Sequence, residues 1–268
     1  MVIPFTKAHG AKNDFLLTWA AEAPIQRHSE IARAICDRHT GIGADGWYLV
    51  RPPDEEADAS VKLYNSDGSS AELSGNGTRC AAAFLVAHGY ALEQIVIATG
   101  AGLKRLKLQS REENCFEFEM EMGRPIVGPE HLNSTLALQR GDVEVTIVDV
   151  GNPQCVFFVN HFPHDWAEIG AEVERHSRFP DRTNVSFVRV LGRHLLDVRF
   201  FERGAGVTMS SGTGSTGAAA AAIAQGLVDS PVTVDTPAGK LLLEWREGVA
   251  HLTGPAEIIG RGEFYFPA

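Results

Sequence analysis

Cysteine is scarce in this chain of 268 residues, and its four cysteines lie far apart. Cys36, Cys80, Cys115 and Cys155 form no CxxC pair, which argues against a zinc-knuckle or thioredoxin-like motif. We expect reduced and mostly buried thiols, because a chain of this length builds a core without disulfides. Basic residues are also few: 24 lysines and arginines stand against 34 aspartates and glutamates, for a net charge of −10. An acidic chain repels phosphate backbones, so we expect no nucleic-acid partner.

Long hydrophobic runs and a leader segment are also lacking. No stretch approaches the ~18 consecutive apolar residues of a membrane-spanning helix, so no membrane partner is expected. The residues from Met1 to Lys7 lack the charged and then apolar segments of a secretory signal. These absences predict a cytoplasmic protein. Hydrophobic residues make up 44% and charged residues 22% of the chain, which is typical of one large or two medium globular domains.

An internal repeat is the most informative feature that the chain does have. The Gly-rich loops at 75–77 and 212–214 lie 137 positions apart, and each precedes an alanine-rich run. The same offset aligns further turn and cap residues: Ser74 with Ser211, Gly89 with Gly226, Thr99 with Thr236, Ala101 with Ala238 and Gly102 with Gly239. A single ungapped shift that aligns so many residues predicts two domains of similar fold.

Both halves have the same predicted order of elements. Strands at 61–64 and 196–201 precede a turn-rich stretch, a Gly-rich loop and a helix, and strands follow at 94–98 and 232–235. Gly89 and Gly226 are placed at the C′ position of these helices. The helices carry almost no charge, which indicates that each is surrounded by its own domain. Further strands are expected at 115–120, 143–148 and 156–159, and a surface helix at 28–37.

The predicted fold class is therefore α/β (α+β), with two pseudo-symmetric domains that each wrap a curved mixed sheet around a central helix. The two Gly-rich loops could bind an anion, since the start of a helix presents unpaired N–H groups and the positive end of the helix dipole. Neither loop is a P-loop or a dinucleotide-binding GxGxxG motif. A tight turn is the alternative for one loop alone, but two symmetric loops favour one small ligand held from both sides.

Eight short motifs, in order over nearly the whole chain, are similar to those of the diaminopimelate epimerases, a family of cofactor-independent amino-acid racemases and epimerases. The motifs are FTKAHGAKNDF (5–15), RHTGIGADG (38–46), NSDGS (65–69), GNGTRC (75–80), GNP (151–153), TNV (183–185), ERGAG (202–206) and GTG (212–214). The resemblance implies an epimerase-like N-terminal domain at 1–114 plus 257–268 and a like C-terminal domain at 115–256. The resemblance also implies an active site in the cleft between the two domains. It leads us to expect a homodimer.

The resemblance assigns roles residue by residue. Ser74 and Ser211 occupy the two acid/base positions that flank the substrate Cα, and Glu202 is a third catalytic candidate. Backbone donors to the substrate α-carboxylate are expected from Gly75, Asn76, Gly212 and Thr213. The remaining substrate-holding positions are Asn13, Asn65, Asn152, Asn184, Glu202 and Arg203, the last five at the distal end of the substrate. The ligand is a small amino acid, and no metal, nicotinamide or pyridoxal cofactor is implied.

Three positions depart from the family pattern. The family has cysteine where this chain has Ser74 and Ser211, and usually histidine where it has Gln154. A thiol has a pKa of about 8.5, whereas an alcohol lies near water, at about 15.7. The difference of ~7 pKa units corresponds to about 10 kcal/mol in the cost of forming the base. Helix dipoles and a dry cleft offset part of this cost, and Glu202 could act as the base itself.

Three functions stay open at this stage. The first is epimerisation of LL- to meso-diaminopimelate in lysine and peptidoglycan synthesis, carried out by the serine pair. The second is another reaction at an amino acid, such as racemisation or dehydration of a hydroxy-amino acid with Glu202 as the base. The third is amino-acid binding without turnover. The two serines fit an engineered Cys→Ser trap or natural divergence, and Gln154 favours divergence because a trap needs no third change.

Overall fold

The two alanine-rich segments form the central helices of two structural units. The computed structural model describes residues 1–90 and 93–267. Unit 1 comprises Met1–Met120 and Gly254–Ala268, and unit 2 comprises Glu121–Thr253. Strands β8 (Cys115–Gly123) and β17 (Val249–Tyr265) each run from one unit into the other. The unit boundaries therefore fall inside these two strands, a few residues from the boundaries expected at 114/115 and 256/257.

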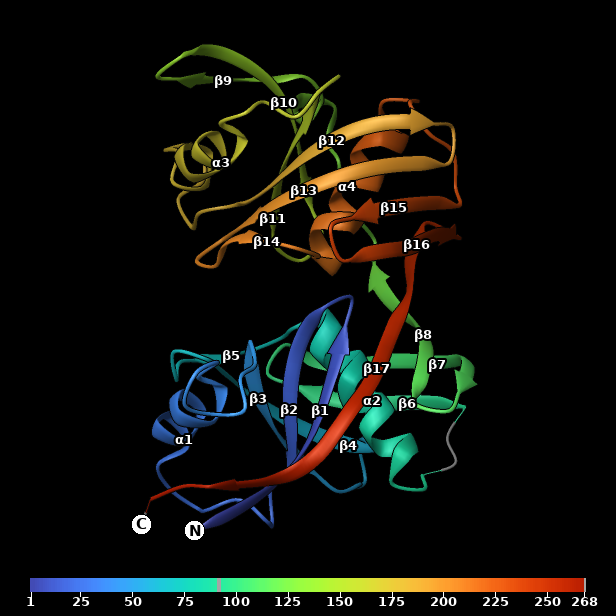
Figure 1. The fold of residues 1–268 in the computed structure, drawn as a ribbon. Coiled ribbons are helices and arrows are strands. Elements are labelled where there is room, and N and C mark those ends of the chain that lie inside the picture. The colour runs from blue at the N-terminus through green and yellow to red at the C-terminus, as the bar shows by residue number, and fades with distance from the viewer. Residues whose placement is uncertain (91–92, 268) are drawn as a thin grey trace. The chain divides into compact units, whose positions relative to one another are not determined.

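Unit 1 is a closed β-barrel around a helix. Its elements are β1 (Val2–Gly10), β2 (Asn13–Trp19), α1 (His28–Cys36), β3 (Gly46–Arg51), β4 (Ala59–Asn65), β5 (Ser70–Ala71), α2 (Gly75–Ala87), β6 (Gln94–Thr99), β7 (Gly102–Glu112) and most of β8. Strand pairing runs β1–β2–β3–β4–β6–β7–β8–β17 and returns to β1, which closes the ring. Helix α2 packs against β1, β2, β3, β6 and β7, and Figure 1 shows it in teal behind β1 and β2.

Unit 2 wraps its sheet around the second alanine-rich helix. Its elements are a short 3-10 helix (Pro129–His131), β9 (Ser134–Leu138), β10 (Gly141–Asp149), β11 (Pro153–Phe158), α3 (Trp166–Glu174), β12 (Asn184–Gly192), β13 (Leu195–Glu202), β14 (Gly206–Thr208), α4 (Gly212–Ala224), β15 (Val232–Thr236), β16 (Gly239–Arg246) and the start of β17. Pairing runs β9–β10–β11–β12–β13–β15–β16–β17, with β14 beside β13. Helix α4 packs against β10 to β13, β15 and β16 (Figure 1).

The alanine content of both helices explains these wrapped sheets. From Cys80 to Val86 and from Ser215 to Ala222 every residue is buried, and most of the side chains are as small as alanine. A helix covered on all sides needs no polar face, and small side chains let the strands approach its axis closely. The buried core of unit 2 forms around Ala218–Ala222. The mixed α+β fold with a central helix in each curved sheet, as predicted from the sequence, is confirmed.

The duplication extends to individual hydrogen bonds. Both central helices have 13 residues and begin at a serine N-cap, Ser74 in α2 and Ser211 in α4. Both are followed by a glycine with positive φ, +93° at Gly89 and +69° at Gly226, at the predicted C′ positions. The Thr99 hydroxyl donates to Gly102 O at 2.7 Å, and its counterpart Thr236 donates to Gly239 O at the same distance. The offset of 137 residues seen in the sequence thus relates equivalent backbone positions.

Most other predicted elements are present within a residue or two. The strand expected at 156–159 is β11, which begins earlier, at Pro153, and ends at Phe158. Proline has no backbone N–H to donate to a neighbouring strand, but it is tolerated as the first residue of a strand. The composition therefore did not indicate that β11 begins at Pro153. Cys36, Cys80 and Cys155 are buried free thiols, and Cys115 is an exposed one. Among the described residues, no helix is long and apolar enough to cross a membrane.

A glycine in the first turn of α2 is required by a close contact with β3. A Cβ atom at Gly77 would lie 2.3 Å from Tyr48 Oη, whereas a Cβ atom at Gly75 would meet Met120 Cε at 3.5 Å, an ordinary contact. We expect Gly77→Ala to lower the free energy of unfolding by about 1–3 kcal/mol through overpacking. Gly75→Ala, the control, should change it by less than about 0.5 kcal/mol. Urea denaturation of both variants is the measurement, and equal stability of the two would contradict the prediction.

Candidate active site

The start of α2 carries the first predicted acid/base residue. Ser74 has extended backbone angles, and its Oγ accepts a hydrogen bond from Gly77 N at 3.2 Å. Thr78 donates to Ser74 O through both its backbone N–H and its hydroxyl, at 2.8 Å each. The N–H groups of Gly75 and Asn76 precede the first intrahelical hydrogen bond, so they have no partner inside the helix. This helix start is suited to binding a carboxylate, since the helix dipole adds to these donors.

A hydrogen-bonded chain links this helix start to a buried arginine. Asn76 Nδ2 donates to Asn13 Oδ1 at 3.3 Å, and Asn76 Oδ1 accepts from Arg79 Nη2 at 2.6 Å. Arg79 is fully buried and also donates to Pro255 O at 3.1 Å. Burial lowers the pKa of Arg79 to about 10, which leaves it charged at neutral pH. A buried cation one turn into the helix adds positive potential to the anion-binding end.

Asn13 is fixed from its other side by a charged cluster. Its Nδ2 donates to Asp45 Oδ2 at 2.6 Å, and Arg38 bridges Asp45 and Asp14 at 2.8 and 2.7 Å. Burial raises the pKa of Asp14, but the hydrogen bonds and charges of Arg38 and Lys7 outweigh it and hold that pKa below its usual value. The cluster keeps the Asn13 amide in one orientation beside Asn76, as a binding residue requires.

Asn65 lies at the end of β4 in the same unit, and its side chain is engaged in a turn. Its Nδ2 donates to Ser69 Oγ at 2.9 Å, and its backbone N–H donates to Ser69 O at 2.8 Å. The Asn65 amide is therefore bonded within its own turn, whereas Asn13 and Asn76 are bonded to each other. Its counterpart under the offset of 137 residues is Glu202, which has different partners.

The start of α4 carries the second predicted acid/base residue, and here a carboxylate contacts it. Ser211 Oγ accepts from Gly214 N at 3.1 Å and donates to Glu202 Oε2 at 2.8 Å. The other carboxylate oxygen, Glu202 Oε1, accepts from the Thr208 hydroxyl at 2.6 Å. The hairpin of β13 and β14 places these residues, because Glu202 pairs with Gly206 at its turn. The helix start at Gly212 and Thr213 offers the same unpaired N–H groups as α2.

Glu202 is poised to accept a proton. Burial raises the pKa of Glu202 above its usual value, against the lowering effect of the hydrogen bonds from Thr208 and Ser211. A carboxylate in a desolvated position is a stronger base than one in water. Glu202 and Arg203 are neighbours in the chain, but they have different partners. In the structure Glu202 binds the two hydroxyls, and Arg203 Nη1 donates to Asp181 O at 3.0 Å.

Asn152 and Asn184 lie at the starts of two neighbouring parallel strands, Asn152 just before β11 and Asn184 as the first residue of β12. Asn184 begins β12, accepts from Arg203 N at 3.0 Å and donates to Pro153 O at 3.3 Å. Asn152 accepts from Gln154 Nε2 at 2.6 Å. Gln154 itself is fully buried, and its side chain packs against Gly217 of α4. The amide that stands where the family has histidine therefore orients Asn152, and no pKa near neutrality remains at this position.

Three residues that contact the predicted site residues were not identified from the sequence. Asp45 and Arg79 lie inside motifs that matched the family, yet nothing in their spacing assigned them a function. Tyr48, which lies against Gly77 of α2, is outside the eight motifs and the predicted strands. By contrast, Cys80 is excluded as a substitute thiol, since it is fully buried in α2 and burial raises its pKa to about 12. A buried thiol with so high a pKa is unreactive at neutral pH.

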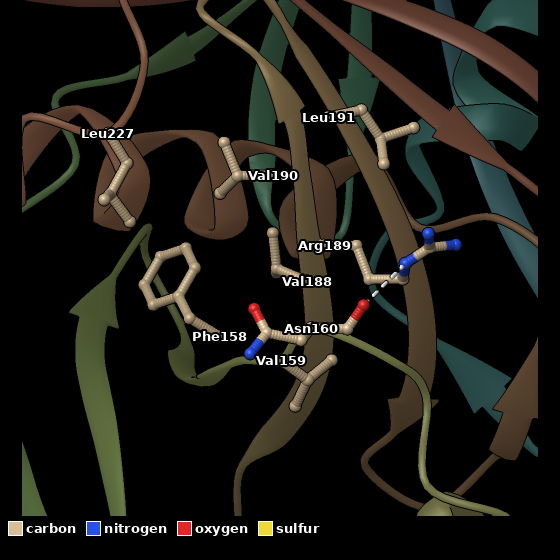
Figure 2. Close-up of a pocket in the computed structure, with 8 residues that line it drawn as sticks. All are labelled: Phe158, Val159, Asn160, Val188, Arg189, Val190, Leu191 and Leu227. Atoms are coloured by element: carbon tan, nitrogen blue, oxygen red, sulfur yellow. Dashed lines mark hydrogen bonds between the residues drawn. The ribbon is translucent and has the colours of Figure 1, made fainter.

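A pocket of about 320 Å³ lies in unit 2, away from the predicted site residues. Its walls are mostly aliphatic and aromatic, and Figure 2 shows Phe158, Val188 and Leu227 along it. Its one cationic side chain, Arg189, is engaged with Asn160 O at 3.3 Å (Figure 2) and with Asp197 at 3.1 Å. No predicted site residue lines this pocket.

Known proteins resemble this chain over nearly its whole length. A family model described as diaminopimelate epimerase matches residues 5–127 and 146–259. The diaminopimelate epimerase of Acetivibrio thermocellus is 36% identical over 275 residues, which cover 97% of each chain. The chloroplastic diaminopimelate epimerase of Oryza sativa subsp. japonica is 38% identical, over 96% of this chain and 79% of its own.

Solved structures agree with the fold at lower identity. A hydroxyproline epimerase from Agrobacterium vitis has a TM-score of 0.70 at 17% identity, covering 98% of this chain and 90% of its own. A probable proline racemase from Agrobacterium radiobacter K84 has a TM-score of 0.73 at 16% identity, covering 97% and 92%. At such identities the likeness concerns the fold. The family match and the full-length relatives show more: this chain is a member of the diaminopimelate epimerase family and an isomerase.

Proposed function

We propose that this isomerase moves the α-proton of diaminopimelate, converting the LL to the meso form for lysine synthesis without a cofactor. The observation that carries the proposal is the 2.8 Å hydrogen bond from Ser211 Oγ to the Glu202 carboxylate at the start of α4. It supplies a base where the family has a thiol. The relatives named above, at 36% and 38% identity, support the substrate.

In the proposed first step, Ser211 Oγ removes the α-proton while its own proton passes to Glu202. One Cα–H bond breaks and one O–H bond forms on Ser211, and the bond from Ser211 Oγ to its former proton is replaced by one on Glu202. The negative charge of the carboxylate thereby moves to the substrate carbanion. Because the proton ends on Glu202, no free alkoxide forms at Ser211, which avoids most of the ~10 kcal/mol cost of ionising an alcohol.

The second step returns a proton to the opposite face of Cα. We assign this role to Ser74, whose position at the start of α2 is equivalent to that of Ser211 at α4. A reaction that works on two faces of one carbon suits a duplicated scaffold with one serine in each repeat. The α-carboxylate is then held by the N–H groups of Gly75 and Asn76 and of Gly212 and Thr213. The positive ends of the same helices stabilise the carbanion.

The polar residues around each serine complete the proposal. Asn13 and Asn76 form one hydrogen-bonded pair, and Asn152 and Asn184 are each fixed by neighbours of their own unit. These amides, together with Asn65 and Arg203, are assigned to the remaining carboxylate and amino groups of the substrate. An arginine suits the distal carboxylate because its guanidinium binds such a group with two parallel hydrogen bonds.

The decisive experiment follows the α-proton by NMR in D₂O. Incubation with LL- or meso-diaminopimelate should replace the α-proton by deuterium and interconvert the two forms, with no added cofactor. Ser211→Ala should abolish exchange, whereas Ser70→Ala, on exposed β5, should leave it unchanged. A flat trace from the unmodified protein at high concentration would reject the function, and tight binding in calorimetry would then identify a binding protein without turnover.

One asymmetry favours a second candidate function. Glu202 contacts Ser211, but its counterpart Asn65 binds Ser69, so the carboxylate base belongs to one serine. Loss of water from a β-hydroxy amino acid needs one competent base at Cα and a donor for the leaving hydroxyl. Hydroxyprolines and other β-hydroxy amino acids should therefore be assayed in parallel. A cytoplasmic location, expected from the sequence, and a homodimer, expected from the family resemblance, both remain predictions.

A further inference from the structure

A buried phenol hydroxyl lies against the first turn of α2. Tyr48, in the middle of β3, is 1% exposed, and its Oη has no hydrogen-bond partner within residues 1–90 and 93–267. A buried hydroxyl without a partner costs free energy, so native proteins rarely keep one without a use. The ring is held by the barrel wall: it makes an edge contact with Phe15, at 5.3 Å between ring centres.

The contact with Gly77 shows where the hydroxyl lies. A Cβ atom at Gly77 would meet Tyr48 Oη at 2.3 Å, closer than any other atom. Gly77 N is the same group that donates to Ser74 Oγ at 3.2 Å, so the phenol oxygen lies beside the N-cap serine. The neighbouring Thr78 hydroxyl donates to Ser74 O at 2.8 Å, and its oxygen can still accept a hydrogen bond. Ser74 Oγ accepts from Gly77 N and has a further lone pair for Tyr48 Oη. Of these two hydroxyls, only Ser74 has a proton-transfer role in the proposed reaction.

Tyr48 remains a hydrogen-bond donor at any pH at which the enzyme works. Burial raises the pKa of Tyr48, while interactions with Thr78 and Ser74 act in the lowering direction without reversing the shift. A neutral phenol beside an oxygen that becomes negative is the arrangement of an oxyanion hole. Burial strengthens such a hydrogen bond, because little water competes for the donor.

The two repeats differ at this point. Ser211 has Glu202 as its partner, whereas no carboxylate is hydrogen-bonded to Ser74 among the described residues. The residue 137 positions after Tyr48 is Val185, which has no polar group. At Gly214, the equivalent of Gly77, the nearest side chain is instead the ring of Phe200. Each serine thus has one distinct polar neighbour, an acceptor at Ser211 and a donor at Ser74.

The geometry points to Tyr48 as the positioning residue of Ser74: its hydroxyl donates a hydrogen bond to Ser74 Oγ when that oxygen gives up its proton. This inference rests on the proposed function, in which Ser74 protonates the substrate carbanion. The Ser74 O–H bond breaks, a Cα–H bond forms, and the negative charge moves from carbon to Ser74 Oγ. Tyr48 stabilises that charge: because a phenol is a stronger acid than an alcohol, the Tyr48 proton shifts toward Ser74 Oγ along the hydrogen bond, and it returns when Ser74 regains its own proton. Glu202 accepts and Tyr48 donates, so the two serines are specialised for opposite halves of one proton exchange.

The test in the enzyme is Tyr48→Phe, with Tyr64→Phe as the matched control. Tyr64 is also buried in unit 1, but its hydroxyl meets the His28 ring at 3.1 Å. We expect Tyr48→Phe to lower kcat about 10²–10³-fold, the usual effect of losing one oxyanion-hole donor, with KM nearly unchanged. The melting temperature should stay equal or rise, because an unpaired buried hydroxyl is removed. Unchanged kcat, or a loss of kcat only in step with melting temperature, would overturn the inference.

A second measurement needs no turnover, so it separates this inference from the proposed function. Ser74→Cys places a thiol next to Tyr48, and its alkylation by iodoacetamide can be followed against pH by peptide mass spectrometry, apart from the exposed Cys115. Adding Tyr48→Phe should raise the pH midpoint of alkylation by about one unit, because a donor to the thiolate is lost. Adding Tyr64→Phe should not move it. An unmoved midpoint in the Tyr48→Phe background rejects the inference even if epimerisation is found, and a shifted one supports it even if the substrate is another amino acid.

Discussion

Glu202→Gln is expected to lower kcat for α-proton exchange about 10²–10⁴-fold, the range for loss of a general base. The variant keeps the size of the side chain and an oxygen that can accept from Thr208 or Ser211, but it cannot take up a proton. Ser211 would then have to ionise as a free alcohol. Exchange rates measured by NMR in D₂O, at saturating substrate, are the test.

The control for this variant is Glu244→Gln. Glu244 pairs with Arg246 on the exposed side of β16, so the same chemical change there should leave kcat as it is. In the unmodified enzyme, burial and hydrogen bonding at Glu202 should also appear in the pH profile. Because the ionised carboxylate is the active form and its pKa is raised, activity should fall with acidification at a pH above the ~4.3 of an ordinary glutamate. A rate that is independent of pH in that range would count against Glu202 as the base.

The same raised pKa gives a stability result of opposite sign. When the folded-state pKa of a carboxyl exceeds the unfolded one, the stabilising contribution is complete at low pH and is lost as pH rises through the folded pKa. Ionised Glu202 therefore weakens the fold at neutral pH. Glu202→Gln removes this cost, so its melting temperature at pH 7 should equal or exceed that of the parent. An inactive variant that is also less stable would indicate that the loss of rate comes from a disturbed fold.

Ser74→Cys combined with Ser211→Cys is expected to raise kcat at least about 10²-fold. The thiol pKa of about 8.5 replaces an alcohol value near 15.7, which makes the deprotonated form cheaper by about 10 kcal/mol. The N-cap positions are retained, and a thiolate at the start of a helix is stabilised by the dipole. Only part of the gain should appear, because Gln154 does not supply the proton acceptor that the family usually has there.

Alkylation and a matched variant provide the controls. Iodoacetamide should inactivate the double-cysteine enzyme and leave the parent active, since three of the four native cysteines are buried. Ser70→Cys, on the exposed β5, should neither raise kcat nor make the enzyme sensitive to iodoacetamide. A double-cysteine variant slower than the parent would mean that the chain has adapted to hydroxyl chemistry, and it would favour the dehydratase-type reaction. Full activity at the level of a typical epimerase would favour the view that the serines replaced thiols in an otherwise intact enzyme.

Elements with strong local signals could be predicted well. The central helices are defined by a serine cap, a Gly-rich first turn, a run of alanines and a C′ glycine, all of which act within a few residues. The strands at 61–64, 94–98 and 232–235 were recognisable from their β-branched and apolar residues, and β6 and β15 bury every second residue. Closure of the unit 1 barrel could not be recognised from the sequence, since it depends on pairing between β17 and the distant strands β1 and β8.

The site was predictable to a different degree in each repeat. Family motifs identified Ser211 and Glu202, and the hairpin of β13 and β14 brings them together over a short stretch of chain. They also identified Asn65, but its amide is bound within its own turn, by Ser69. Tyr48 was not identified from the sequence, because a tyrosine in an apolar strand most often belongs to the core. No residue near it in the chain indicates a polar neighbour.

The sequence by itself determined the duplication, the two capped helix starts and the family, because each of these is written in residues that are adjacent or related by one offset. The tertiary structure decided which polar group each serine meets. Ser211 has a carboxylate that accepts its hydrogen bond, and Ser74 has a buried phenol at the neighbouring Gly77. The physical reason is that strand pairing and helix packing, which join residues far apart in the chain, set the neighbours of a side chain, and those neighbours set its chemistry.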